Sequence, residues 1–563
     1  MKISTGNPLS KIQNLLRLES KDVTIIIFYG LVMALLSLIV PVAISSLVNT
    51  VAFGVFLQPV LVLTFIVFVA YIFLTVLTAM QTILAEMIQR RFFARSAIGI
   101  ANRMPFINRD ILDDYYPPEL VNRFFDTMTV QKGLITLMLE AIPGFLGAMV
   151  GLFIIALYHP YFLVFDIIIL LITVPLLGYY LGRNAYNAKM DESTAKYKVA
   201  AWLQDISRHN LTFRTVRGFD YAMDRNENNV NEYLSSRAKY FKFWMRQFVG
   251  FLGLKTIGSS FFLGLGGYLV IQRELTLGQL VAAEIIVLTI IDNLTKFGKY
   301  LEVYYDVSAA IVKLTKLEEI PLVERRKGLN PDVQGALSIM VQNLSLEDSS
   351  GNDFVSNLSF KIPSGKILGI TGDNPIGAAL IIDAIAGLRE PAGGIIQLQE
   401  FDQRDLDEEF LRSKIVLLRG NEIFEGSLIE NVQLRNDCPE TMVRDALERV
   451  GLNGNLTKNL NTGLTDHLQT YGSELNPTTA HQVTAARAIL QRPGILLVDE
   501  FFDDMADYGL ENMKSLMKEM KRKTTMIIVT YNPDILALCD SVLMFRNLSY
   551  KISTSPARGK RVR

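Results

Sequence analysis

The chain is 563 residues long, half of them hydrophobic, with a formal net charge of zero and a mean hydropathy of +0.27. It is too long for one ordinary domain, and its composition favours a membrane protein that also has a large polar part. The zero net charge excludes the strongly basic class of nucleic-acid-binding proteins, so we expect no nucleic acid partner. The two cysteines, Cys438 and Cys539, lack CxxC spacing, which predicts neither a disulfide framework nor a zinc site.

Six apolar runs fill the first half of the chain, each near the roughly 20 residues that span a bilayer. They predict transmembrane helices at about 22–48, 58–86, 133–158, 161–182, 247–271 and 278–300. The first run is too long, and starts too far in, for a cleaved signal peptide. Residues 1–320 are therefore predicted to form a six-helix membrane domain.

Long polar links follow the second and fourth runs, at 89–132 and 183–247. These links hold most of the lysines and arginines of this half of the chain. The positive-inside rule therefore predicts that the links and both chain termini are cytoplasmic.

The pattern changes after residue 320. Residues 321–335 contain Pro321, Gly328 and Pro331 and are predicted to be a linker. From 336 to 550, short β-rich runs alternate with amphipathic helices, which predicts an α/β domain with a largely parallel sheet. Residues 551–563 form a basic tail, predicted to be a solvated chain end, with contact to anionic lipid headgroups as the alternative.

The segment after one predicted strand has the G-x4-G spacing of a phosphate-binding loop, with Gly372 and Gly377 as its glycines. A helix is predicted to follow at 378–388. A working loop continues with a lysine that contacts the β- and γ-phosphates and a hydroxyl that binds Mg²⁺. Ala378 and Ala379 stand at these two positions.

Two further residues of this loop oppose phosphate binding. Pro375 removes one backbone N–H from the cradle, and Asp373 adds negative charge. The helix N-terminus still favours anions by about 0.3–1 kcal/mol, which cannot replace a lysine and a metal ligand. We expect weak nucleotide binding or none; a variant loop that still binds ATP is the alternative.

Six spans followed by a P-loop-type α/β domain resemble the half-transporter form of ATP-binding cassette (ABC) exporters, over nearly the whole chain. The resemblance is closest to peptide and protein exporters of the type I secretion kind. It implies a six-span helical exporter domain followed by an ABC nucleotide-binding domain. The segments that carry it lie in the family's order: Glu274–Leu280 before the sixth span, Ile423–Val432 after the Q-loop, Tyr471–Leu490 around the signature helix and Ile495–Glu500 on the Walker B strand.

Several family motifs are altered here. The Q-loop glutamine falls on Arg419 and the switch histidine on Tyr531. The aromatic residue that stacks on adenine falls near Asp348. The signature motif, which presents a serine hydroxyl and glycine N–H groups to the partner's γ-phosphate, falls on Leu475, Asn476, Pro477, Thr478 and Thr479. Its proline removes a donor, and its threonines add bulk where glycine permits close approach.

Only the Walker B acids match the family pattern. By resemblance, Asp499 would orient Mg²⁺ and Glu500 would be the general base for the attacking water. Because the lysine and the hydroxyl are missing, we expect Glu500 to be idle. The alternative role of both acids is a structural pair at a strand end.

Two cassettes of this family sandwich two ATP molecules, so a homodimer of this chain would have two impaired sites. We therefore expect a catalytically degenerate subunit of a heteromeric export complex, in which an ATPase-competent partner binds ATP and Mg²⁺. No resident metal is expected. The alternatives are a non-transporting scaffold or regulator, and an ATP-driven homodimer with altered motifs. The expected location is a bacterial plasma (inner) membrane, with the cassette in the cytoplasm.

Two polar segments, Tyr116–Asp126 and Ala200–Ser207, resemble coupling segments of peptide and protein exporters. A peptide or protein substrate is expected; a generic loop shared with lipid and drug exporters is the alternative. We expect no N-terminal peptidase domain of the kind some peptide exporters carry.

Two charged residues within the predicted spans also bear on function. Lys255 and Asp292 are nearly equidistant from the outer turn between spans five and six. They predict an ion pair, within one chain or between subunits, with snorkelling toward the inner membrane face as the alternative.

Overall fold

The protein is described by a computed structural model that covers residues 8–53, 57–107, 121–173, 182–323, 326–347, 351–434, 438–452, 463–546 and 549–553. The chain divides into two compact units. The first runs to Ile320 and is helical. The second runs from Pro321 and includes the short segment that begins at Phe106. Ile107 pairs with Leu322 there, which differs from the predicted membrane domain of residues 1–320.

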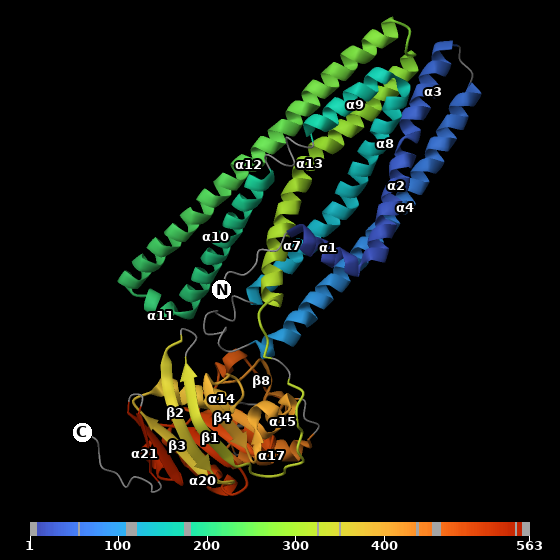
Figure 1. Cartoon of the computed structure of the whole chain (residues 1–563). Coiled ribbons are helices and arrows are strands. Elements are labelled where there is room, and N and C mark those ends of the chain that lie inside the picture. The colour runs from blue at the N-terminus through green and yellow to red at the C-terminus, as the bar shows by residue number, and fades with distance from the viewer. Residues whose placement is uncertain are drawn as a thin grey trace. The chain divides into compact units, whose positions relative to one another are not determined.

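The helical unit consists of long helices with short connections (Figure 1). Their bounds are α1 (Pro8–Leu18), α2 (Ser20–Ser37), α3 (Ile39–Phe53), α4 (Leu57–Arg103), α7 (Asp126–Thr136), α8 (Ile142–Tyr158), α9 (Pro160–Thr173), α10 (Gly182–Arg208), α11 (Asn210–Phe213), α12 (Val216–Ile271) and α13 (Leu277–Glu318). The described part of this unit also has three short turns: η1 (Met104–Phe106), η2 (Arg123–Phe125) and the π-helical η3 (Leu137–Ala141).

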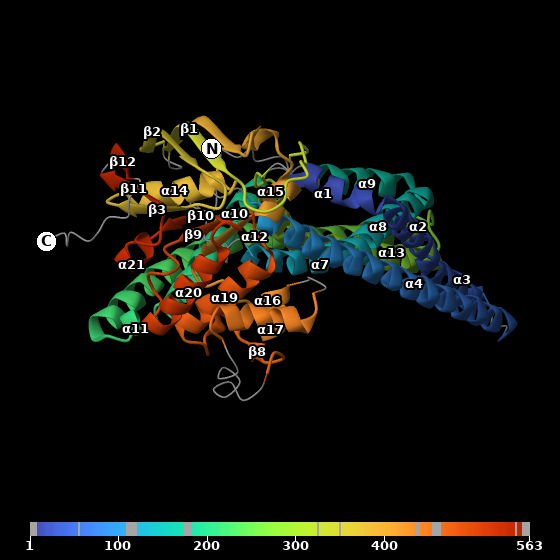
Figure 2. The same cartoon turned by 90° about the horizontal axis from the view of Figure 1, so that it is seen from below.

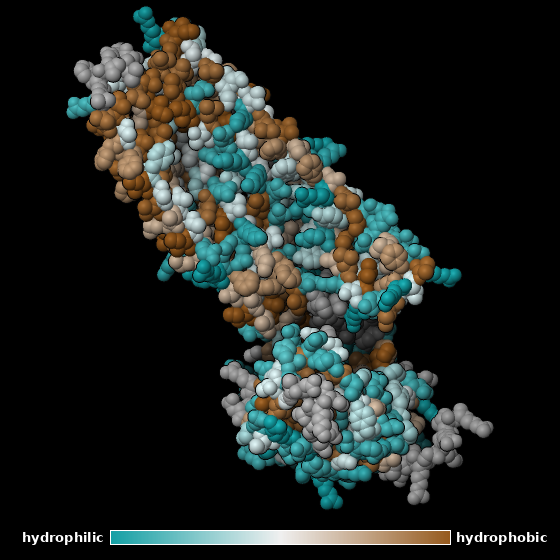
Figure 3. All heavy atoms as spheres, turned by 180° about the vertical axis from the view of Figure 1, so that it is seen from behind, coloured by the Kyte–Doolittle hydropathy of each residue, from teal (hydrophilic) through white to brown (hydrophobic). Residues whose placement is uncertain are grey.

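Five segments in the described part of the chain are long and apolar enough to cross a membrane: Ser20–Thr50, Gln58–Phe106, Arg123–Tyr158, Val216–Ile271 and Leu277–Thr315. The predicted fourth span, 161–182, begins on α9, and its residues 174–181 lie outside the described residues. Large apolar side chains on α4 face outward, among them Phe65, Phe68 and Phe73. Hydrophobic side chains cover the end of this unit that carries α3 and the start of α4 (Figure 3).

The polar stretches predicted as links are largely helical. α4 continues to Arg103, and α10 packs along the polar first half of α12. Ion pairs join these two helices, from Lys198 to Glu232 and from Arg237 to Glu192. Thr215 starts α12 by accepting a hydrogen bond from the Gly218 N–H. The helices therefore continue beyond the apolar runs, because charged residues support a helix that packs in water.

The second unit contains two larger sheets (Figures 1 and 2). One sheet has the order β12-β11-β3-β10-β9-β6, with all neighbours parallel except β12. The other is antiparallel, with the order β2-β1-β4-β5. The strands are β1 (Ile339–Glu347), β2 (Asp353–Ile362), β3 (Ile367–Gly372), β4 (Gly393–Leu398), β5 (Phe401–Asp402), β6 (Ile415–Arg419), β7 (Gly426–Ser427), β8 (His467–Leu468), β9 (Ile495–Asp499), β10 (Thr525–Val529), β11 (Ser541–Arg546) and β12 (Ser549–Ser553).

The helices of this unit are α14 (Pro375–Ile385), α15 (Glu408–Lys414), α16 (Leu428–Gln433), α17 (Glu440–Arg449), α19 (Pro477–Leu490), α20 (Asp507–Met520) and α21 (Pro533–Leu536). Among the described residues, two 3-10 turns lie between them, η5 (Gln403–Asp405) and η6 (Thr470–Gly472). In Figure 2, α16 and α17 lie beside α19, in agreement with their contacts.

The parallel sheet separates two hydrophobic cores. Along β9, Ile495 and Leu497 enter the core shared with α14 and the antiparallel sheet. Leu496 and Val498 enter the core shared with α16, α17, α19 and α20. Since successive side chains of a strand point to opposite faces, a strand covered on both faces is apolar throughout. This explains the continuous apolar run of β9.

The predicted boundary of the basic tail, at residue 551, is wrong. Residues 551–553 belong to β12, which pairs antiparallel with β11. Tyr550 anchors this strand, because its hydroxyl accepts from the Ser359 N–H and donates to the Asn357 carbonyl. The remainder of the tail, 554–563, lies outside the described residues.

Candidate functional site

Four parallel strands bring the candidate site residues to one edge of the sheet. In register, Arg419 of β6 lies beside Asp499 of β9, and Asp499 lies beside Val529 of β10. Gly372 ends β3 on the other side of β10. The carboxyl ends of parallel strands are the usual place for a ligand in such a sheet.

The start of α14 differs from the prediction. The helix begins at Pro375, three residues before the predicted start at Ala378. Asn374 caps it, and proline is well suited to the first helical position. The Gly377 N–H donates to the Asn374 side-chain oxygen at 2.8 Å, and the Ala378 N–H donates to the Asn374 carbonyl at 3.1 Å. Two N–H groups that would face a phosphate are therefore bonded within the chain.

Both glycines of the loop have steric roles of their own. Gly372 has a φ of +131°, and a Cβ there would clash with the Phe545 carbonyl of β11. A Cβ on Gly377 would lie 2.5 Å from the Asn374 side chain. The G-x4-G spacing is therefore required by strand packing and by the helix cap, whatever the loop binds.

Arg419 joins three parts of the site. Its guanidinium donates to Asp499 Oδ2 at 2.5 Å and to Asp383 Oδ1 at 2.7 Å. A longer contact of 3.5 Å reaches the Ala379 carbonyl. Both carboxylates are almost fully buried. One cation thus bridges β6, β9 and α14.

Burial disfavours the charged form of Arg419, but the attraction of Asp383 and then of Asp499 outweighs it and raises the pKa of Arg419. The guanidinium therefore keeps its positive charge. The group borders a hollow of about 590 Å³, which Ala379, Asp499 and Glu500 also line.

Glu500 lies at the exposed end of β9, in a left-handed conformation with φ of +51°. Its N–H donates to the Val529 carbonyl at 3.0 Å. Burial, and then repulsion from Asp499 and Asp503, raises the pKa of the Glu500 carboxyl, while a hydrogen bond from Tyr531 opposes the rise. Two further hydrogen bonds position the Tyr531 backbone: its N–H donates to Asp503 at 3.2 Å, and Thr530 donates to the same carboxylate.

The signature-like segment starts α19. The Asn476 side chain accepts from the Thr479 N–H at 2.9 Å and caps the helix. Asn476 and Pro477 are exposed, whereas Thr478 and Thr479 are buried. Thr478 Oγ1 accepts from the Ala506 N–H at 2.9 Å. The segment therefore presents an amide and a proline ring to solvent.

The structure brings Arg419, Asp499, Glu500 and Ala379 to one hollow, with Tyr531 bonded to Glu500. Leu475, Asn476, Pro477, Thr478 and Thr479 do not line it. Asp348 lies outside the described residues.

Sequence reasoning missed two residues of this site, Asp383 and Asn374. A signal for Asp383 was available, because an acid inside the apolar helix α14 needs a buried partner. For Asn374 the signal was an asparagine directly before a proline.

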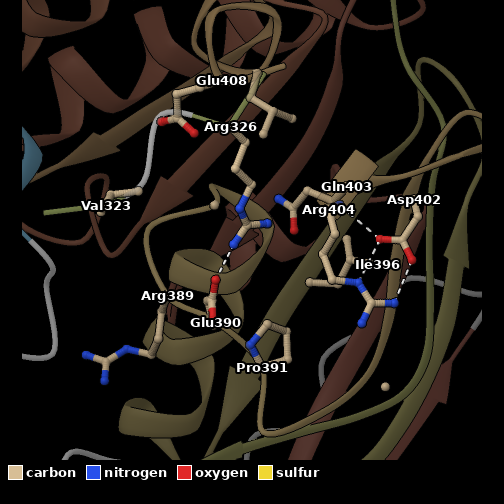
Figure 4. A pocket seen from close by; sticks show the side chains of 13 residues that line it. Val323, Arg326, Arg389, Glu390, Pro391, Ile396, Asp402, Gln403, Arg404 and Glu408 are labelled. Carbon is tan, nitrogen blue, oxygen red and sulfur yellow. Dashed lines mark hydrogen bonds and ion pairs between the residues drawn. The ribbon is translucent and has the colours of Figure 1, made fainter. Parts of the chain in front are cut away.

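A second hollow, of about 450 Å³, lies where the linker meets the cassette (Figure 4). Arg326 pairs with Glu390, and Arg404 pairs with Asp402 at 2.6 Å. The linker backbone is also held there, because the Leu329 N–H donates to the Asp405 carbonyl at 2.7 Å. The Arg326–Glu390 pair and this backbone hydrogen bond fasten the linker to the cassette.

In the helical unit, Lys255 Nζ lies 2.5 Å from Asp292 Oδ1. The ion pair is within the chain and links α12 to α13. Both side chains remain about half exposed in this single chain.

Comparisons with known proteins give a consistent picture. A sequence family described as ABC transporter matches residues 355–503. An alpha-hemolysin translocation ATP-binding protein of Escherichia coli O157:H7 is 28% identical over 274 residues, which cover 47% of this chain and 38% of that protein. A putative export ATP-binding/permease protein of Rickettsia bellii (strain RML369-C) is 21% identical over 384 residues, covering 67% of this chain and 66% of that protein. The matches thus span less than two thirds of either relative.

A solved structure of a bacterial Atm1-family ABC exporter with ATP bound superposes with a TM-score of 0.78 at 16% identity. The superposition covers 95% of this chain and 94% of that one. At this identity the likeness concerns the fold. It confirms the predicted fold class, a helical membrane domain followed by an α/β cassette. The chain therefore carries an ABC transporter nucleotide-binding domain fused to a transmembrane domain, in the half-transporter arrangement of the ABC exporter fold.

Proposed function

We propose that this chain is a subunit of an ABC export complex that supplies half of the translocation pathway without hydrolysing ATP itself. The observation that carries the proposal is the Arg419 bridge between Asp383 and Asp499. In the family pattern, the Walker B aspartate orients Mg²⁺. Here the same carboxylate is already paired with a guanidinium, so a divalent cation would have to displace it.

Mg-ATP does not fit the residues around the P-loop-like segment. Neither Ala378 nor Ala379 offers a charge or a hydroxyl, and Asn374 holds the N–H groups of Gly377 and Ala378. A single transition-state donor is worth about 10²–10³ in rate. Losing the lysine, the metal ligand and several donors together should remove turnover at this site, so Glu500 has no water to activate.

A degenerate cassette needs an ATPase-competent partner to drive transport. In a mixed dimer, the partner's P-loop would face Asn476 and Pro477 of this chain. Asn476 caps α19 there, so the segment presents no serine hydroxyl. We propose that the partner binds ATP and Mg²⁺, with slow hydrolysis at that composite site. The complex would lie in a bacterial plasma (inner) membrane, with the cassette and both termini in the cytoplasm.

A peptide or protein is the proposed substrate class. The support is the similarity to the alpha-hemolysin translocation protein and to a leukotoxin export ATP-binding protein of Aggregatibacter actinomycetemcomitans, 25% identical over 272 residues. This class is distinct from that of another relative, an iron-sulfur clusters transporter of Oryzias latipes, 24% identical over 347 residues.

The test is purification of this chain, tagged, from its native membranes. An ABC transporter chain with an intact P-loop lysine should co-purify. Exchange of that lysine in the partner should abolish the ATPase activity of the complex, whereas Glu500→Gln in this chain should leave the activity unchanged. Loss of activity with Glu500→Gln would contradict the proposal, as would normal substrate export in cells that lack this chain.

A further inference from the structure

A hollow of about 640 Å³ lies among α2, α4, α8 and α13 of the helical unit. We propose that it binds a small amphipathic zwitterion, whose ammonium group pairs with Glu140 and whose carboxylate pairs with Lys296. The proposal rests on the export function above in one respect: it treats the hollow as part of a transport pathway.

Glu140 and Lys296 are the two charged residues that line this hollow. Both side chains are exposed, and within the described part of the chain neither forms an ion pair. Lys255 and Asp292, by contrast, pair with each other at 2.5 Å between α12 and α13, and neither lines the hollow. Ionisable side chains within membrane spans are costly and normally face a cavity or a partner. A ligand with both charges would supply both missing partners.

The two charges lie at similar depth. At the helical rise of about 1.5 Å per residue, Glu140 lies about 27 Å from the end of α8 and Lys296 about 29 Å from the start of α13. The two helix ends are close in the chain fold, since His159 beyond α8 bonds Glu274 before α13 at 2.8 Å. Both charges therefore lie at a similar distance along their helices from that end of the helical unit.

A π-helical turn, Leu137–Ala141, carries Glu140. Pro143 lies just beyond this turn and cannot donate the N–H that an α-helix would direct at the Leu139 carbonyl. The wider turn that results is a feature often found at functional sites. Both Leu139 and Glu140 line the hollow.

The rest of the lining is amphipathic. A Cβ on Gly144 or Gly147 of α8 would meet only Asn293 of α13, at 3.7 Å and 3.8 Å, so these glycines leave room. Thr289 and Asn293 supply polar groups, while Ile286 and Ile290 supply an apolar wall. The volume is typical of small-molecule sites, which excludes a folded protein. An amino acid or short peptide with an apolar side chain fits this lining.

The experiment uses the full chain in nanodiscs, alone and in its co-purified complex, without nucleotide. The probe is the dipeptide leucyl-phenylalanine, with its N-acetyl and C-amide forms, titrated by calorimetry. We expect the free dipeptide to bind more tightly than either blocked form. Glu140→Gln should weaken binding of the free dipeptide about tenfold and abolish its advantage over the N-acetyl form. Lys296→Gln should also weaken binding of the free dipeptide about tenfold and should abolish its advantage over the C-amide form.

The matched control is the double variant Lys198→Gln/Glu232→Gln, which removes an ion pair between α10 and α12 outside the hollow and should bind like the wild type. Equal affinity of all three probes would overturn the proposal, as would unchanged binding in both Glu140→Gln and Lys296→Gln. Binding of phosphatidylethanolamine in place of the dipeptide would also overturn it. None of these results touches the proposed loss of hydrolysis, because no nucleotide is present.

Discussion

At the scale of single residues, an arginine of the cassette pairs with Asp499, the carboxylate that orients Mg²⁺ in the family pattern. Arg419 contacts Asp383 and Asp499, and all three groups come from different elements. An arginine suits this position, because its fork of donors can serve two carboxylates at once. Both carboxylates therefore share a cationic partner before any ligand binds.

We predict that Arg419→Gln destabilises the full chain by about 2–4 kcal/mol, because it leaves two buried carboxylates unpaired and side by side. The loss should appear as a lower melting temperature of the cassette. Adding Asp383→Asn and Asp499→Asn should restore most of it. An unchanged melting temperature for Arg419→Gln would show that the bridge does not stabilise the cassette.

Glu500 gives a prediction for pH. A raised carboxyl pKa means that the folded chain holds this proton more tightly than the unfolded chain, so stability falls as pH rises through the folded-state pKa. Glu500→Gln should therefore raise the free energy of unfolding by less than about 1 kcal/mol, since the group is exposed, and raise the melting temperature slightly. The gain in stability should appear above the ordinary glutamate pKa of about 4.3 and vanish at lower pH. A gain that is largest in acid would contradict this assignment.

Most of this site could be found in the sequence only because the expected motif residues are absent there. Ala378, Ala379, Arg419 and Tyr531 were found because a known motif has other residues there. What replaces the motif could not be predicted, because the Arg419 bridge depends on the register of β6 against β9 and on Asp383, a residue outside every motif.

At the scale of elements, asparagine side chains accept backbone N–H groups at the N-termini of two helices. Asn374 caps α14 and Asn476 caps α19, each by accepting an N–H three residues on. The apolar periodicity predicted that these helices exist. It could not predict that α14 starts inside the loop, since that depends on one side-chain hydrogen bond.

The two-variant comparison at Asn476 tests the cap. Asn476→Ala should cost about 1 kcal/mol, whereas Asn476→Ser should be nearly neutral, because serine caps as well as asparagine. Denaturant melts of the full chain in detergent would measure both. Equal losses in the two variants would contradict a capping role.

Close helix packing in the membrane unit offers a second test at this scale. A Cβ on Gly133 of α7 would clash with Val307 of α13. Gly133→Ala should therefore destabilise the helical unit by about 1–3 kcal/mol. Gly253 of α12 has open space at its Cβ position and provides the control. Similar melting temperatures for Gly133→Ala and Gly253→Ala would contradict the packing argument.

At the scale of the whole molecule, the fold class follows from the order of apolar runs, linker and alternating strands and helices. The extent of the helices does not. The polar halves of α4, α10 and α12 have no apolar pattern that reveals their length, because they pack through ion pairs such as Lys198–Glu232. The proposed non-hydrolysing role is consistent with a half-transporter fold in which Arg419 pairs with Asp499.

The most direct test of the central claim is Mg-ATP hydrolysis by the purified full chain in nanodiscs. We predict turnover no higher than that of empty nanodiscs, and the same value for Glu500→Gln. Magnesium-dependent turnover of the wild-type chain that Glu500→Gln abolishes would contradict the account, because Glu500 would then be activating a water at a working site.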